Sequence, residues 1–166
     1  MPAPPAGRRL RRPRAGQSVT RRAGRPAPRR DAGHRSAPHT ADRVIEAWGE
    51  DRPSCLTEAV RALVEGFAEV PSGAHGRRVP IELRAPNDPE LLLALLQEVI
   101  YVVDALGEVP VACRLADRGD AVCGDLEVVP AAEATLVGPV PKGVSRSGLA
   151  MARHRARWRC RAVVDV

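Results

Sequence analysis

The hydrophobic positions divide the chain into short strand-like runs and two longer helical patterns. The first run, residues 43–49, ends in Gly and is typical of a strand, so the Asp42 carboxylate lies where that strand begins. The first helical pattern is expected to start at Ser54 as its cap and to end near Pro71. One apolar stripe marks its buried face and predicts an amphipathic helix lying on a sheet: Leu56, Val60, Leu63, Val64 and Phe67.

The second helical pattern has the clearest boundaries in the chain. Asp88 is the expected cap, Pro89 suits the first helical position, and Gly107 closes the end. Apolar residues surround most of this helix, which predicts a central, deeply buried element. Its few polar side chains, including Glu98, are therefore candidates for function.

The remaining apolar runs predict strands at 78–83, 109–115, 121–129, 132–137, 142–151 and 158–166. Pro80 places the first of these at an edge or at a strand start. Short connections rich in Gly, Asp and Pro indicate hairpins and a largely antiparallel or mixed sheet. The predicted fold is an α+β two-layer sandwich, with both helices packed on one face of the sheet.

Length and composition bound the class of protein. The 166 residues, 44% of them hydrophobic, suffice for one modest domain. The longest apolar run, 91–103, is interrupted by Gln97 and Glu98, so we expect a soluble, cytoplasmic protein without a membrane span. The four cysteines are scattered with no CxxC pair, which favours reduced thiols used as small apolar residues over zinc or a disulfide.

The charge is distributed unevenly. Residues 1–36 contain eleven Arg and one Asp, a net charge of +10, whereas residues 37–166 contain fifteen basic and nineteen acidic residues, a net charge of −4. This composition predicts a disordered tail at 1–38 and a folded domain at 39–166. The tail has two interpretations. Its arginines suit a nucleic-acid-binding arm, since they neutralise phosphates. Alternatively it is an incidental extension, because Arg outnumbers Lys twenty-five to one in the chain, as GC-rich coding would produce.

The chain contains no Walker loop, no GxGxxG after a strand, no HExxH and no GxSxG elbow. What remains is a possible carboxylate cluster, if the strand beginning at Asp42 meets the strand ending at Asp165 and the chain terminus. Three like charges a few Å apart need a cation, and oxygen ligands favour calcium or magnesium over zinc. In the alternative, Asp42 makes a local turn hydrogen bond and Asp165 is a frayed end.

Several motifs, in this order and spacing, resemble the archease family. They are His39-Thr40-Ala41-Asp42, Ile45-Glu46-Ala47-Trp48-Gly49, Leu91-Leu92 with Gln97-Glu98 and Tyr101, Lys142-Gly143-Val144, and Val163-Val164-Asp165-Val166. The resemblance spans residues 39–166. It implies a small α/β protein that is not an enzyme but activates an RNA ligase of the RtcB type in tRNA splicing or RNA repair, by promoting guanylylation of the ligase histidine.

The resemblance also implies a set of functional residues. Asp42, Asp165 and Val166, the last through a main-chain or terminal oxygen, are the implied metal ligands. Calcium is the expected cation, with magnesium or manganese as alternatives. Lys142 falls on the family's lysine position, and His39 and Glu98 are further candidates for partner contact. The expected partner is the ligase, with RNA contacted indirectly or weakly.

The chain departs from the family pattern in three places. Arg43-Val44 replaces Val-Gly, Gln97 replaces Asn, and Ser145-Arg146-Ser147 replaces Thr-Tyr-His, which bears on any partner contact made there. Residues 142–164 carry seven basic and no acidic residues. This charge suits contact with a ligase or with RNA phosphates, or it marks an ordinary solvated strand face. A second hypothesis is a nucleic-acid-binding or RNA-modification accessory protein that acts through the arginine tail.

Overall fold

The computed structural model of the protein describes residues 32–38 and 42–166. In this part of the chain the strands form two larger antiparallel sheets and one short pair. The four-stranded sheet has the order β1 (Gly33–Pro38), β2 (Asp42–Gly49), β9 (Arg157–Asp165) and β8 (Gly143–His154). The three-stranded sheet has the order β4 (Arg77–Arg84), β6 (Ala121–Pro130) and β5 (Glu108–Asp117). The short pair is β3 (Ala68–Glu69) with β7 (Thr135–Leu136), which follows the 3-10 turn η1 (Ala131–Glu133).

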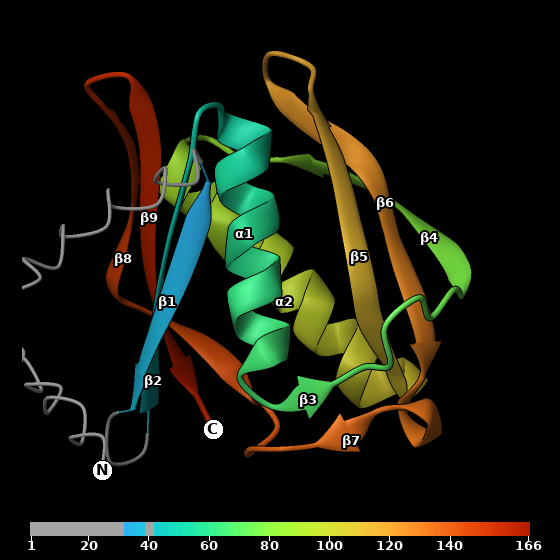
Figure 1. Cartoon of the computed structure of the whole chain (residues 1–166). Coiled ribbons are helices and arrows are strands. Elements are labelled where there is room, and N and C mark those ends of the chain that lie inside the picture. Colours follow the sequence, from blue (N-terminus) through green and yellow to red (C-terminus); the bar gives the residue numbers. More distant parts are fainter. Residues whose placement is uncertain (1–31, 39–41) are drawn as a thin grey trace, which may run out of the picture.

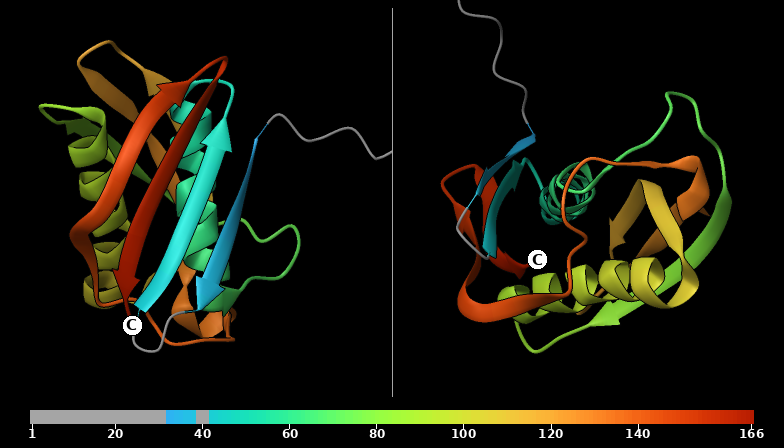
Figure 2. Two further views of the ribbon diagram at one scale, coloured as in Figure 1. Left: turned by 90° about the vertical axis from the view of Figure 1, so that its left-hand side faces the viewer. Right: turned by 90° about the horizontal axis from the view of Figure 1, so that it is seen from below.

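Two helices, α1 (Arg52–Glu65) and α2 (Asp88–Leu106), lie between the two larger sheets (Figures 1 and 2). α1 packs against β2 and β5, and α2 packs against β8 and β5. The predicted α+β class and the antiparallel pairing are confirmed. The strands are divided between two sheets because α2 is apolar round most of its circumference and must bury that surface on more than one side.

In each helix the proline occupies the second helical position, where the sequence analysis predicted the first one for α2. Each helix therefore begins at the residue before its proline. Asp51 caps α1, in place of the predicted Ser54, and its carboxylate accepts a hydrogen bond from the Ser54 backbone N–H at 2.7 Å. Asn87 caps α2, in place of the predicted Asp88, and accepts from the Glu90 N–H at 2.9 Å. Proline is tolerated at the second helical position because that N–H also lacks an intrahelical partner.

The helix ends differ in how well the sequence predicts them. α2 ends at Gly107, as predicted, in the left-handed conformation with φ 65°. α1 ends at Glu65 with Gly66 as its C-cap, well before the expected Pro71, and the chain then forms β3. Neither described helix is long and apolar enough to cross a membrane.

An edge strand, β1, occupies residues that the sequence analysis assigned to the tail. It pairs antiparallel with β2, with Ser36 opposite Ile45. From β1 the His34 side chain reaches α1, where Nδ1 lies 2.7 Å from Glu58 and Nε2 lies 2.8 Å from Glu65. Backbone pairing with β2, the bridging His34 and an ion pair between Arg35 and Glu46 therefore hold the strand. The rest of the predicted tail, residues 1–31, lies outside the described residues.

The core between the sheets is built mainly from Leu, Val and Ala, with Phe67 as its fully buried aromatic residue. Cys55 of α1 and Cys160 of β9 are part of this core. The neighbouring Cys160 side chain and burial both raise the pKa of Cys55, so its thiol stays protonated. These two cysteines act as small apolar residues that join α1 to the four-stranded sheet.

Arg52, in the first turn of α1, links three separate segments. Its Nε donates to Asp117 at the end of β5 at 2.9 Å, its Nη1 to Asp88 in the first turn of α2 at 3.0 Å, and its Nη2 to the Gly119 carbonyl at 2.7 Å. The guanidinium holds the pKa of the Asp117 carboxyl below its ordinary value. Because the Arg52 side chain is only 15% exposed, these bonds are partly shielded from water.

We expect Arg52→Leu to lower the free energy of unfolding by about 1–2 kcal/mol, since it leaves two carboxylates without their partner. Urea unfolding at neutral pH measures the change. The matched control is Arg84→Leu, which removes a 60% exposed arginine paired with exposed Glu82 and Asp120 and should cost less than about 0.5 kcal/mol. Equal losses in the two variants would contradict the bridging role of Arg52.

Candidate functional site

The first strand of the predicted domain and the last strand of the chain are neighbours in the four-stranded sheet. Their antiparallel register places Asp42 directly opposite Asp165, as the strand-end prediction requires. Directly opposed residues of an antiparallel pair project from the same face, with Cβ atoms about 4.5–5.5 Å apart. The register therefore sets Asp42 beside Asp165. The ribbon in Figure 2 shows that the chain also ends at this end of the sheet.

The start of β8 forms the other side of this end of the sheet. Gly143 pairs with Asp165, and the Lys142 backbone N–H donates to the Asp165 carbonyl oxygen at 2.8 Å. A Cβ at Gly143 would lie 3.3 Å from Oδ2 of Asp165, so the glycine leaves room for that carboxylate. The Lys142 side chain is exposed. The structure thus brings Asp42, Asp165, Val166 and Lys142 to one end of one sheet.

Two further predicted residues stand apart from this group. Glu98 is half-buried on α2, the helix that packs against β8, and no hydrogen bond or ion pair links it to Asp42, Asp165 or Lys142 among the described residues. His39 lies outside the described residues, in the connection between β1 and β2. The described site therefore consists of the two aspartates, the chain end and the neighbouring Lys142.

The two aspartates carry like charges at directly opposed positions. Asp42 is half-buried, and neither aspartate forms an ion pair within residues 32–38 and 42–166. Like charges directly opposed across two strands destabilise a sheet. Among the described residues no three His, Cys, Asp or Glu side chains cluster, so a cation held here would also need an oxygen of Val166. An all-oxygen donor set of this kind fits a hard divalent cation.

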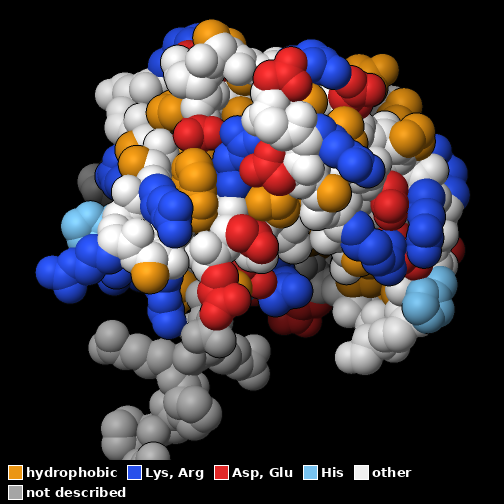
Figure 3. Space-filling view, turned by 90° about the horizontal axis from the view of Figure 1, so that it is seen from above, with side chains coloured by type: hydrophobic (Ala, Val, Ile, Leu, Met, Phe, Trp, Pro, Cys, Tyr) orange, Lys and Arg blue, Asp and Glu red, His pale blue; other side chains and the backbone are white. Residues whose placement is uncertain are grey.

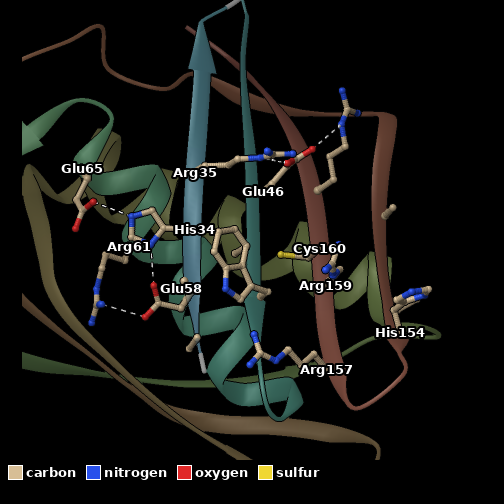
Figure 4. A pocket seen from close by; sticks show the side chains of 17 residues that line it. His34, Arg35, Glu46, Glu58, Arg61, Glu65, His154, Arg157, Arg159 and Cys160 are labelled. Atoms are coloured by element: carbon tan, nitrogen blue, oxygen red, sulfur yellow. Dashed lines mark hydrogen bonds and ion pairs between the residues drawn. The ribbon is translucent and has the colours of Figure 1, made fainter. Parts of the chain in front are cut away.

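The sequence analysis gave no role to His34 or Arg35, because it placed both in the tail. In the structure they lie on opposite faces of β1: His34 points toward α1, and Arg35 points over β2 toward Glu46 (Figure 4). The residues Gly33, His34 and Arg35 show no apolar alternation, so hydrophobic periodicity gave no signal for this strand.

Comparison with known proteins adds to this geometry. Residues 34–166 match the sequence model of the "Archease protein family (MTH1598/TM1083)". The chain belongs to the archease family. The archease match begins at His34, inside β1, and so includes a strand that the sequence analysis assigned to the tail.

Two curated relatives, both named probable protein archease, come from the CDC 1551 and H37Rv strains of Mycobacterium tuberculosis. Each is 42% identical to this archease-family chain over 140 residues, which is 84% of this chain and 78% of the relative. A crystal structure from Thermotoga maritima, described as an archease and possible chaperone, is 17% identical with a TM-score of 0.57, over 78% of this chain and 94% of that one. The solution structure of Methanobacterium thermoautotrophicum protein 1598 is 15% identical with a TM-score of 0.60, over 81% and 99%. At these identities the two structures share the fold.

We expect Asp42→Asn to stabilise the metal-free protein by about 0.5–1 kcal/mol, because it removes one of two opposed like charges. Urea unfolding in the presence of a chelator measures the change. The control is Asp125→Asn on β6, which removes a carboxylate that pairs with Arg114 at 3.2 Å and should not stabilise the protein. A loss of stability in Asp42→Asn under these conditions would mean that the carboxylate already has a favourable partner.

Proposed function

We propose that this archease-family protein is a non-catalytic, metal-binding activator of an RtcB-type RNA ligase. In this role it promotes guanylylation of the ligase and so sustains turnover in tRNA splicing or RNA repair. The observation that carries the proposal is the register of β2 and β9, which sets Asp42 against Asp165 beside the chain end and Lys142. The description of the Thermotoga maritima relative as a possible chaperone also suits an accessory protein.

In this proposal Asp42, Asp165 and a main-chain or terminal oxygen of Val166 would hold one divalent cation, most readily calcium, with magnesium or manganese as alternatives. A cation bound there would supply a positive charge that offsets the opposed aspartate carboxylates. The ligands themselves join the beginning of β2 to the end of β9, and so hold this end of the sheet in a single arrangement. Occupancy of the site then controls the shape of the surface presented to the ligase.

Lys142 lies one residue before Gly143, which pairs with Asp165, so its exposed side chain starts beside the proposed cation site. An ammonium group is a compact donor suited to phosphate oxygens. We assign Lys142 a role in contacting the ligase or its nucleotide, with Glu98 and His39 as secondary candidates for partner contact.

We expect Asp42→Ala to reduce stimulation of ligase guanylylation by about tenfold or more, which corresponds to the loss of roughly 1.4 kcal/mol of coupling. The measurement is the rate of guanylate transfer to the ligase at a limiting concentration of the activator. Asp120→Ala, in the β5–β6 turn, is the control and should leave stimulation unchanged. Full stimulation by Asp42→Ala would show that the aspartate pair has no part in activation.

The chain end provides a second test of the same site. Addition of one Gly after Val166 keeps the Val166 carbonyl but moves the terminal carboxylate, whereas deletion of Val166 removes both oxygens from their position. If the terminal carboxylate is a ligand, both changes should impair activation as much as Asp42→Ala. Calcium should raise the melting temperature of the wild type and of Asp120→Ala. It should not raise that of Asp42→Ala, of the variant with the added Gly or of the variant without Val166. A calcium response that survives all three changes would place the cation elsewhere.

A further inference from the structure

The four-stranded sheet has one covered and one open face. Its buried side chains, among them Ile45, Ala47 and Ala162, face the helices. The alternate residues of the same strands face away, and no described helix or loop lies in front of them (Figure 2). We call these alternate residues of β1, β2, β8 and β9 the outer face.

The end of the outer face that lies away from Asp42 holds an aromatic ring in a hollow between small residues. Trp48 is half-buried and lies opposite Gly33 on one side and Arg159 on the other. A Cβ at Gly33 would fall 2.7 Å from the indole, so the ring lies against the backbone of β1. Next to Arg159 and Arg161 the facing residues of β8 are only Ala152 and Ala150. These small residues help to line a hollow that also contains Trp48.

Basic side chains surround the indole. Arg35, Arg159, Arg161, Arg157 and His154 line the same hollow, and Figure 4 shows most of them projecting from the sheet. Figure 3 shows basic side chains gathered on the side of the molecule that carries the β8–β9 turn.

The one carboxylate of the outer face in this region is Glu46, which is shared by two of these arginines. It contacts Arg35, whose side chain is 73% exposed, and it lies 4.0 Å from Arg161. Arg161 is also held by the Gly148 carbonyl at 3.1 Å, so its guanidinium has a fixed place. Arg159 is exposed and forms no ion pair with the described residues. The part of the outer face around Trp48 thus carries an excess of positive charge, and the Arg159 guanidinium is available to an external anion.

We propose that this part of the outer face binds a single strand of RNA, with a base stacked on Trp48 and backbone phosphates on Arg159 and Arg35. An aromatic ring on an open sheet flanked by arginines is the combination that single-stranded nucleic acid requires, because bases stack on the ring while guanidinium groups neutralise phosphates. A duplex hides its bases from such a ring. The choice of RNA over DNA rests on the proposed function; the binding itself does not.

The test is fluorescence anisotropy of a labelled ten-nucleotide oligouridylate with the full chain, without ligase and without divalent cation. We expect Arg159→Gln to weaken binding about tenfold, as loss of a charge-assisted phosphate contact does. The matched control is Arg118→Gln, an exposed arginine in the β5–β6 turn that loses the same charge and should change the affinity less than about twofold. The arginines of residues 1–31 are present in every variant and contribute equally to each.

A second pair of variants tests stacking. Trp48→Leu should weaken binding at least about fivefold, and Trp48→Phe should keep most of the affinity, because a base also stacks on a phenyl ring. The retained fluorescence of Trp158, half-buried on β9, reports whether each variant is folded. Oligouridylate should quench tryptophan emission in the wild type and not in Trp48→Leu.

Three results would overturn the proposal. Equal weakening by Arg159→Gln and Arg118→Gln would mean that net charge alone attracts RNA. Equal affinity for a duplex of the same length would exclude stacking. Equal affinity for a polyglutamate peptide, with the same dependence on Arg159 and Trp48, would make the outer face a docking surface for an acidic protein. Because the assay contains no ligase and no metal, each of these results is independent of whether the protein activates a ligase.

Discussion

The pairing of β2 with β9 is the constraint on which both the core and the candidate site depend. These are the two central strands of the four-stranded sheet, and their pairing sets the start of β2 beside the end of β9. The same register turns Ile45 and Ala162 toward the helices and sets Asp42 against Asp165. A slip of one residue would expose the first pair and separate the second, so the hydrophobic core fixes the geometry of the carboxylates.

The sequence offered this pairing as one of two alternatives, because each strand has a carboxylate at the relevant end, and the resemblance to the archease family favoured it. Prediction from the sequence was wrong where side-chain hydrogen bonds, and not hydrophobic periodicity, determine the structure. In β1 the residues Gly33, His34 and Arg35 offer no apolar alternation, and the strand is held by pairing with β2 and by His34 between two glutamates of α1. At the helix starts, a proline suits the first two helical positions almost equally, so Asp51 and Asn87 could be identified only from their hydrogen bonds.

The aspartate pair and the Arg52 bridge show two opposite uses of charge in one small domain. Arg52 gathers carboxylates from two other segments around a shielded guanidinium, which stabilises the packing of α1 against α2 and the β5–β6 turn. Asp42 and Asp165 are instead opposed without a described cationic partner, an arrangement that costs stability. In the proposed function a bound cation would restore the balance at this pair.

The outer face of the four-stranded sheet carries charges of opposite sign at its two ends. Asp42 and Trp48 are six residues apart on β2, about 20 Å along the strand, so the carboxylates and the arginines lie within the reach of one short nucleic-acid segment. If both proposals hold, a cation at Asp42 and Asp165 removes the repulsion that these carboxylates exert on an RNA backbone bound at Arg159. The two sites then favour each other, and by linkage RNA must strengthen cation binding by the same factor as the cation strengthens RNA binding.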